Sequence, residues 1–94
     1  MLEIVRNVQH HFNKRPLNYI LNSLNSEYRE LIEEIDLVNE SKPAGDDGVI
    51  GEAVDMISCL LDMILQVNPN ISSAELNDIL SKKCDKWVRL YGNN

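Results

Sequence analysis

The chain has 94 residues, of which 44% are hydrophobic and 26% are charged, and its formal net charge is −6. This length excludes a second domain, and the ordinary balance of hydrophobic and charged residues excludes global disorder. The negative charge argues against binding to nucleic-acid polymers, which depends on Lys and Arg contacts with phosphates. We therefore expect one domain over residues 1–94, with a core built mainly from aliphatic side chains.

The N-terminal half of the chain predicts two helices separated near a proline. Apolar residues first recur at helical spacing at Leu2, Val5, Val8 and Phe12. This pattern predicts a short helix over residues 2–13. Pro16 suits an early position of a second helix, because its fixed φ favours a helix start. The apolar stripe of that helix, which extends to about residue 39, consists of Leu17, Ile20, Leu21, Leu24, Tyr28, Leu31, Ile35 and Val38.

The C-terminal half predicts two more helices. Residues 41–48 are rich in turn formers and read as a surface loop, and a helix over residues 49–67 is apolar nearly all round. Ser72 and Glu75 have the spacing of a capping box, which predicts the start of a fourth helix. No strand-like alternation competes with these patterns. The expected fold is all-α, a four-helix bundle.

Cysteine usage and hydropathy indicate the compartment. Cys59 and Cys84 lie in apolar helical patterns without CxxC spacing and without a preceding signal peptide, so we expect buried thiols in a reducing, cytoplasmic environment. The most apolar stretch, residues 54–67, is too short to cross a bilayer and contains two Asp residues, so no membrane partner is expected. Trp87 and Tyr91 recur with the apolar positions of the fourth helix, which favours core packing over stacking on a nucleotide base.

Acidic residues are concentrated in the middle of the chain. Residues 27–62 hold eleven acids and two bases, for a local charge of −9, which leaves +3 for the remainder. On the second helix, spacings of three and four make Glu27, Glu30 and Glu34 successive neighbours, whereas Glu33 is expected to face water. Glu27 and Glu34 border the expected core, and Glu30 lies further round the helix.

The third helix has one acidic stripe on an otherwise apolar surface. Glu52, Asp55 and Asp62 fall, together with Cys59 and Gln66, within an arc of about 80°. Buried carboxylates require a cation, a partner or water, and few basic residues are near in sequence. Carboxylates from facing helices are ligands that hard divalent cations prefer, so the two helices predict a site that holds Mg²⁺ against a phosphorylated ligand.

The segments from Glu27 to Ile35 and from Gly51 to Asp62 resemble the two halves of the all-α nucleotide pyrophosphohydrolases of the MazG type, whose signature is Glu-x-x-Glu followed by Glu-x-x-Asp. The resemblance covers about residues 17–67. It implies a helical bundle, usually dimeric or higher, that uses Mg²⁺ to split a nucleoside triphosphate into a monophosphate and pyrophosphate. By position it implies four metal ligands: Glu27, Glu30, Glu52 and Asp55.

The first pair has competing registers, because Glu33 or Glu34 can also pair with Glu30. Ser26 stands where many relatives carry a further acid. Glu34 and Asp62 are candidates for additional metal or supporting contacts. Glu30 is the candidate general base, because the less buried member of the cluster is the freest to take a proton from water. On the fourth helix, Lys83 lies nearer the core edge than the neighbouring bases and is the candidate phosphate contact.

Two other functions stay open beside a cytoplasmic hydrolase acting on a nucleotide. One is a phosphoribosyl-ATP pyrophosphohydrolase, although the Lys-x-Gly-Glu-Glu stretch usual in that family is replaced by Asn-Ser-Glu at residues 25–27. The other is a non-catalytic helical oligomer that retains the fold. The apolar surface of residues 49–67 exceeds what three other helices of one small chain cover, which predicts a homodimer or homotetramer with the second or third helix at the interface.

Overall fold

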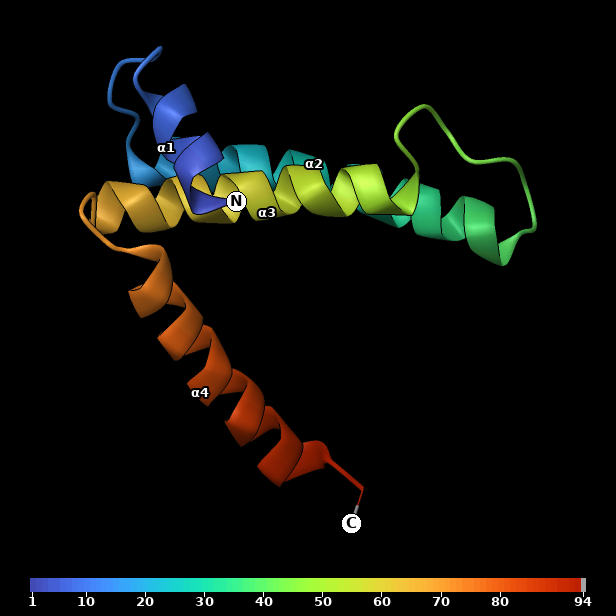
Figure 1. The fold of residues 1–94 in the computed structure, drawn as a ribbon. Coiled ribbons are helices and arrows are strands. Elements are labelled where there is room, and N and C mark those ends of the chain that lie inside the picture. The colour runs from blue at the N-terminus through green and yellow to red at the C-terminus, as the bar shows by residue number, and fades with distance from the viewer. Residues whose placement is uncertain (94) are drawn as a thin grey trace.

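The computed structural model describes residues 1–93 and is all-helical (Figure 1). Its helices are α1 (Leu2–Gln9), α2 (Leu17–Asn39), α3 (Gly48–Val67) and α4 (Ser73–Tyr91). No strand is present in residues 1–93, so the all-α prediction is confirmed. None of the helices in this part of the chain combines the length and the apolar character needed to cross a membrane.

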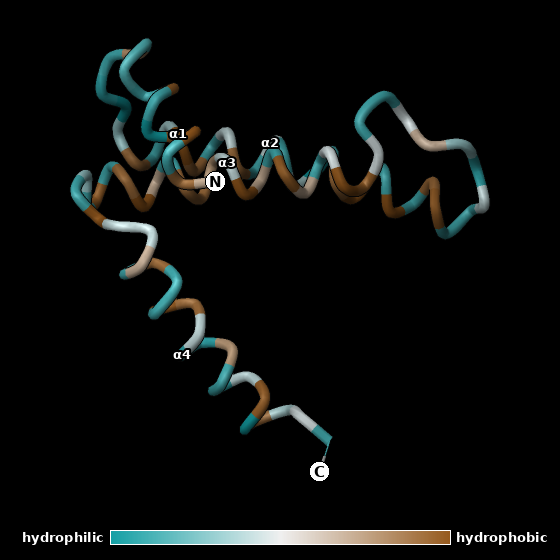
Figure 2. Tube along the Cα trace, viewed as in Figure 1, coloured by the Kyte–Doolittle hydropathy of each residue, from teal (hydrophilic) through white to brown (hydrophobic). Residues whose placement is uncertain are grey.

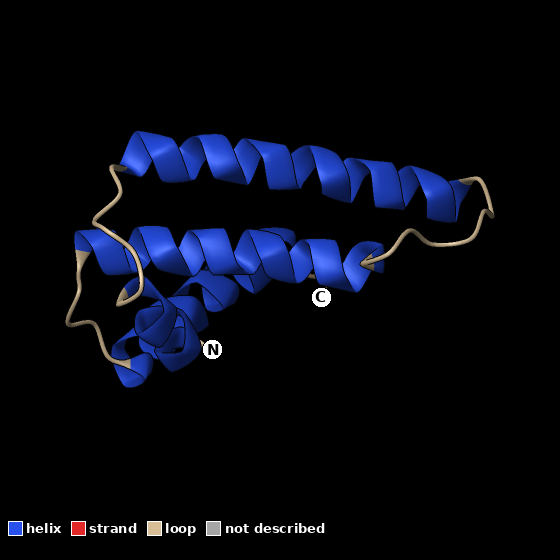
Figure 3. Cartoon of the chain, turned by 90° about the horizontal axis from the view of Figure 1, so that it is seen from above, coloured by secondary structure: helices blue, strands red, loops and turns tan. Residues whose placement is uncertain are grey.

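The long helices α2 and α3 form the body of the molecule. They lie side by side and antiparallel, joined by the loop that follows Asn39 (Figures 1 and 3). α1 packs against the C-terminal half of α3, where a small core forms from Leu2, Leu61, Leu65 and Ile71. Ile20 of α2 is also fully buried. α3 is thus the central element, in contact with both α1 and α2, as its apolar sequence predicts.

The predicted helix boundaries are largely confirmed. Pro16 is the N-cap of α2, and Ser72 forms a reciprocal capping box with Glu75 at the start of α4. Only the first helix is shorter than expected: it ends at Gln9, and residues 10–12 form turns. Phe12 lies outside this helix and is exposed, so it does not share a helix face with the preceding apolar residues, although its spacing from them is helical. Its ring instead lies under the Arg15 guanidinium, 5.4 Å from the ring centroid.

The fourth helix departs from the body of the molecule (Figure 1). No residue of α4 is buried, and contact with the small core is made through Leu76 in its first turn. The expected core packing of Trp87 and Tyr91 and the expected burial of Cys84 are therefore wrong for the single chain, where all three are exposed. Helical spacing shows which residues share a face, but it does not show that another element covers that face.

The helix pair α2/α3 also leaves apolar side chains exposed. Figure 2 shows hydrophobic residues recurring along the traces of both helices. Ile50, Val54 and Ile57 are exposed in the N-terminal half of α3, beyond the end covered by α1. The single chain therefore has more apolar surface than its own helices cover, as the sequence of α3 predicts.

Candidate metal centre

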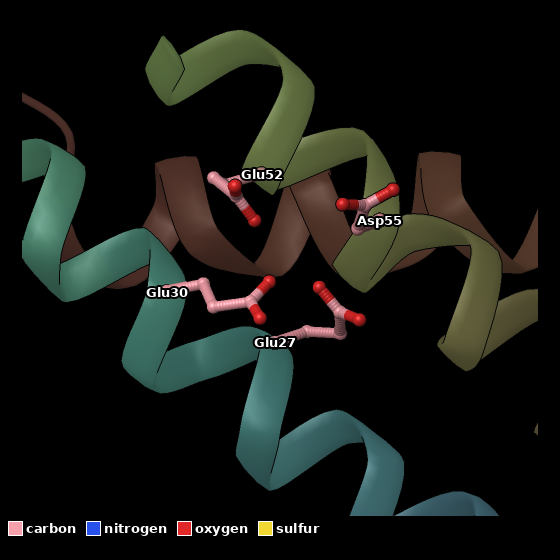
Figure 4. A group of neighbouring side chains, drawn as sticks. All are labelled: Glu27, Glu30, Glu52 and Asp55. Atoms are coloured by element: carbon pink, nitrogen blue, oxygen red, sulfur yellow. The ribbon is translucent and has the colours of Figure 1, made fainter. Parts of the chain in front are cut away.

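Four carboxylates from α2 and α3 converge between the two helices (Figure 4). Each of Glu27, Glu30, Glu52 and Asp55 offers an oxygen, and these oxygens all lie within 4.8 Å of one another. Glu30 faces Glu52, and Glu27 faces Asp55, across the space between the helices. The structure thus brings together the four residues that the sequence motifs single out, and among the competing registers it selects Glu27 as the neighbour of Glu30.

The arrangement follows from helix geometry and the antiparallel pairing of α2 with α3. Glu27 and Glu30 are three residues apart on α2, and Glu52 and Asp55 are three apart on α3, so each pair shares one face of its helix. These two faces lie against each other where α2 and α3 pack together. Rigid helices therefore fix the backbones of all four acids, and only side-chain torsions adjust to a ligand.

The cluster contains buried oxygens without hydrogen-bond partners. Glu52 is only 7% exposed, and its Oε2 atom is buried and unpaired. The Oε2 atom of the half-buried Glu27 is also buried and unpaired. An unpaired buried carboxylate oxygen is costly, so its burial in a cluster of like charge requires a proton or a cation.

The proton affinities of the cluster show the same electrostatic strain. Burial raises the pKa of Glu52 to about 7, reinforced by a hydrogen bond with Glu30 and by repulsion from Glu30, Asp47 and Asp55. Burial likewise raises the pKa of Glu27, and its hydrogen bonds and repulsion with Glu30 and Asp55 act in the same direction. In the absence of a cation Glu52 is therefore partly protonated near neutral pH, and a bound cation would compete with protons for Glu52 and Glu27.

The spacing of the oxygens suits a divalent cation if the four carboxylates move slightly closer together. An octahedral Mg²⁺ with oxygens at about 2.1 Å places opposite ligands about 4.2 Å apart, and Ca²⁺ at about 2.4 Å places them about 4.8 Å apart. The largest separation in the cluster, 4.8 Å, lies at the upper end of this range. Repulsion spreads carboxylates apart when no cation holds them, so the donor set fits either cation.

A hollow of about 400 Å³ opens beside the cluster toward the loop between α2 and α3. Six of its eight lining residues are acidic, among them Glu30 and Glu52 of the cluster and Asp46 and Asp47 of the loop. No Lys or Arg lines this hollow. A phosphate could enter it only together with cations that neutralise both partners.

Glu34 and Glu33 lie outside the four-carboxylate cluster. Glu34 is buried, and its Oε2 accepts a hydrogen bond from the backbone N–H of Gly45 at 3.1 Å. A Cβ atom at residue 45 would collide with the Glu34 carboxylate, so alanine at this position would push that carboxylate aside. Glu34 therefore ties the loop to α2. Glu33 is exposed, as its position on the helix predicts.

Asp62 lies on the acidic stripe of α3 but has partners of its own. Its carboxylate is within 2.9 Å of Arg15 Nη2 and accepts a hydrogen bond from Gln9 Nε2 at 2.6 Å. Gln9 also donates to the Asp62 carbonyl oxygen at 3.2 Å. Asp62 thus joins α3 to the end of α1 and to the connection before α2. No local sequence pattern indicates this pairing, because 47 and 53 residues separate the partners along the chain.

The remaining candidates lie away from the cluster or are chemically passive. Lys83 is exposed on α4, which runs away from the α2/α3 pair, so the structure does not bring it to the acidic cluster of the same chain. Cys59 borders the acidic stripe and is half-buried. Burial, together with the negative charges of Glu27, Asp62 and Asp55, raises the pKa of the Cys59 thiol, which disfavours the thiolate needed for nucleophilic or metal-binding chemistry.

Comparison with protein-family models, curated proteins and solved structures yields no match to this chain.

Proposed function

We propose that the protein is a Mg²⁺-dependent nucleotide pyrophosphohydrolase that splits a nucleoside triphosphate into a monophosphate and pyrophosphate. The observation that carries this proposal is the convergence of Glu27, Glu30, Glu52 and Asp55 within 4.8 Å, on two helices and with two buried oxygens unpaired. The order and spacing of these acids also resemble the MazG-type signature. One line of support is spatial and the other lies in the sequence.

The four acids of the cluster would hold the cation. Mg²⁺ bound there would neutralise phosphate charge and orient the phosphate oxygens and the water. The residues fit this role because hard oxygen donors are already gathered, and a bound cation would offset the burial and the repulsion between acids that raise the pKa values of Glu27 and Glu52.

Glu30 is the member of the cluster best placed to handle a proton. It is the exposed one of the four, whereas Glu52 is buried and Glu27 and Asp55 are half-buried. Its carboxylate faces the cluster and also lines the hollow, where a water molecule and a phosphate group could meet. In the proposed reaction Glu30 takes a proton from the attacking water as the water oxygen bonds to phosphorus and the anhydride bond between the α- and β-phosphoryl groups breaks, which releases the monophosphate and pyrophosphate.

The hollow favours a ligand that arrives with its own cations. Its acidic lining repels a free polyphosphate, but it attracts a nucleoside triphosphate that is complexed with Mg²⁺. This charge pattern favours a metal–nucleotide complex over an uncomplexed anion. It leaves base and sugar preference open, because no aromatic residue lines this hollow.

The test is pyrophosphate release from a panel of ribonucleoside and deoxyribonucleoside triphosphates, with Mg²⁺ and with a chelator. Asp55→Asn should abolish Mg²⁺-dependent release, because it removes one ligand charge while preserving shape. Asp36→Asn is the matched control: it also neutralises an acid of α2, yet Asp36 is exposed and lies outside both the cluster and the hollow. Its turnover should equal that of the wild type. Glu30→Gln should lose most of its turnover even at saturating Mg²⁺, and its cation affinity should fall because Glu30 is one of the four proposed ligands.

Three results would contradict the proposal. One is turnover that survives Asp55→Asn, and another is full turnover of Glu30→Gln, which would remove Glu30 from the reaction. The third is absence of release from every nucleoside triphosphate. In that case, hydrolysis of phosphoribosyl-ATP would indicate the alternative activity, that of a phosphoribosyl-ATP pyrophosphohydrolase.

A non-catalytic, metal-binding oligomer is the second candidate function. The observation that favours it is the hollow without a basic lining residue, since enzymes acting on phosphates generally add Lys or Arg to the metal. Calorimetric titration with Mg²⁺ separates the alternatives. Cation binding that is lost in Asp55→Asn, together with no turnover of any nucleotide, would establish this candidate.

A further inference from the structure

A second hollow lies at the end of the molecule opposite the loop between α2 and α3. α1, the turns that follow it and the connection before α4 gather there, around the C-terminal end of α3 (Figure 1). This hollow has a volume of about 700 Å³, against about 400 Å³ for the acidic hollow beside the cluster. Gln66, which lines it, lies eleven residues beyond Asp55 on α3, roughly 16 Å along the helix axis. The two hollows are therefore separate, and the larger one has the size of a small-molecule site.

The lining of this second hollow is basic, in a chain whose formal net charge is −6. Arg6, Lys14 and Arg15 contribute three positive charges, and among residues 1–93 Glu3 is the only acid that lines it. None of the eleven acids of residues 27–62 belongs to the lining. Asp62 lies just outside and pairs with Arg15, so three bases against two acids leave a charge of +1. We call this hollow the basic hollow.

Arg15 is held in place at the basic hollow while one of its donors has no acceptor. Its Nη2 atom lies 2.8 Å from an Asp62 carboxylate oxygen, and its guanidinium lies over the Phe12 ring. A guanidinium carries five N–H donors, and the Arg15 Nε–H is buried and unpaired in residues 1–93. An unpaired buried donor on a charged group is costly. The Arg15 side chain therefore indicates an acceptor that the chain itself does not supply.

The remaining donors around the basic hollow are fixed or free of competing partners. Arg6 pairs with Glu3 and donates to the carbonyl oxygen of Ile71, which anchors the connection before α4 in the small core. Lys14 is exposed and forms no ion pair within residues 1–93. Ser73 lines the hollow in the first turn of α4, where backbone N–H groups lack intrahelical acceptors. Positive charge and free donors thus meet in one place.

We propose that the basic hollow binds a phosphate group, either as inorganic phosphate or as part of a small phosphorylated ligand. A phosphate carries up to two negative charges and several acceptor oxygens, which match a lining of guanidinium, ammonium and backbone N–H donors. Next to these donors the hollow offers the Phe12 ring and amide side chains that could contact an organic part of the ligand: Gln9, Asn13, Gln66 and Asn70. This inference rests on the charge and geometry of the basic hollow and does not depend on the proposed catalysis.

The test is calorimetric titration of the whole chain with inorganic phosphate, adenosine monophosphate and adenosine. A chelator is present throughout, because without divalent cations the acidic cluster repels anions. At least one of the two phosphates should bind with a Kd of about 1 mM or below, and added NaCl should weaken the binding because exposed cations are screened. Equal affinities for both phosphates would identify free phosphate as sufficient, whereas tighter binding of adenosine monophosphate would identify a phosphorylated organic ligand. Adenosine that binds as tightly as adenosine monophosphate, or no binding of either phosphate, would overturn the proposal.

Nuclear magnetic resonance locates the bound phosphate on the chain. In ¹H–¹⁵N spectra recorded during the same titrations, the Arg15 side-chain Nε–H and the Ser73 backbone N–H should shift with the calorimetric Kd. The backbone signals of Glu30 and Glu52 should stay in place, because they belong to the acidic cluster at a distance along the helices. Shifts confined to the acidic cluster would refute the assignment to the basic hollow.

Two substitutions and their controls test the lining of the basic hollow. Lys14→Gln removes an exposed charge and should weaken phosphate binding about fivefold, whereas Lys86→Gln, exposed on α4 away from the hollow, should have no effect. Ser73→Glu should abolish binding by repulsion, yet an acid in the first turn favours the helix, so α4 should stay folded. Its control Ser81→Glu adds the same charge outside the hollow and should bind like the wild type.

Asp55→Asn separates this site from the metal centre. It should leave phosphate binding in the presence of chelator unchanged, whatever its effect on pyrophosphate release. Binding that survives both Lys14→Gln and Ser73→Glu at wild-type affinity would overturn the proposal. Binding that changes in Asp55→Asn and survives Ser73→Glu would place the anion at the acidic cluster and refute it as well.

Discussion

Asp62→Asn tests whether Asp62 serves as a structural tie or as part of the metal centre. The Asp62 carboxylate is 10% exposed and contacts Arg15 at 2.8 Å and Gln9 at 2.6 Å. Loss of one partner from a buried ion pair costs about 3–5 kcal/mol. The Arg15 side chain is 29% exposed, so water recovers part of its solvation, and we expect the free energy of unfolding to fall by about 2–3 kcal/mol.

The assay is urea denaturation followed by circular dichroism, at one protein concentration because association shifts apparent stability. Asp78→Asn is the control: the Asp78–Lys82 pair is highly exposed, and its loss should cost less than about 0.5 kcal/mol. Calorimetry should show an unchanged affinity of Asp62→Asn for Mg²⁺ under conditions where the variant is folded. A loss of stability below about 1 kcal/mol, or a large loss of cation affinity, would refute the structural assignment of Asp62.

Three further predictions concern the cluster and the loop after α2. The pKa of Glu52 in the folded chain, about 7, is above its ordinary value of 4.5, so folding takes up a proton between these values. With a chelator present, the urea midpoint should therefore fall as pH rises from about 5 to about 8, and Mg²⁺ should reverse this trend because cation affinity grows as protons leave. Gly45→Ala should lower the free energy of unfolding by about 1–3 kcal/mol, measured by urea denaturation, because a Cβ displaces the buried Glu34 carboxylate from its backbone partner. Ser41→Gly should raise it by about 0.5–1 kcal/mol in the same assay, since Ser41 has φ of 56°; a destabilised Ser41→Gly variant would contradict this reasoning.

The four acids of the cluster could be predicted because the relevant information is local to each helix. Spacing alone places Glu27 with Glu30 and Glu52 with Asp55 on shared faces, and the structure brings these pairs together. Spacing did not choose among Glu27, Glu33 and Glu34 as the neighbour of Glu30. That choice depends on the rotation of α2 relative to α3, which is set by packing.

Asp62 and Glu34 show where reasoning from one helix fails. Both lie on the side of a helix that faces its neighbour, and both were candidates for metal or supporting contacts. In the structure, Asp62 meets Arg15 and Gln9, and Glu34 meets the backbone of Gly45. The partner of a buried carboxylate depends on which segments fold over it, and helical periodicity contains no information about those segments.

The sequence by itself determined the helical class and the grouping of acids on two helix faces. It also determined the boundaries of three of the four helices to within about two residues. These features are local, because capping, proline placement and periodicity act within a few residues. The tertiary structure decided which acids meet, which carboxylates are instead bound by protein partners, and that α4 leaves the body with Trp87 exposed. These features depend on contacts between segments far apart in the chain. The anchored connection at Ile71 fixes the direction of α4, so its apolar side is left to be covered from outside the chain.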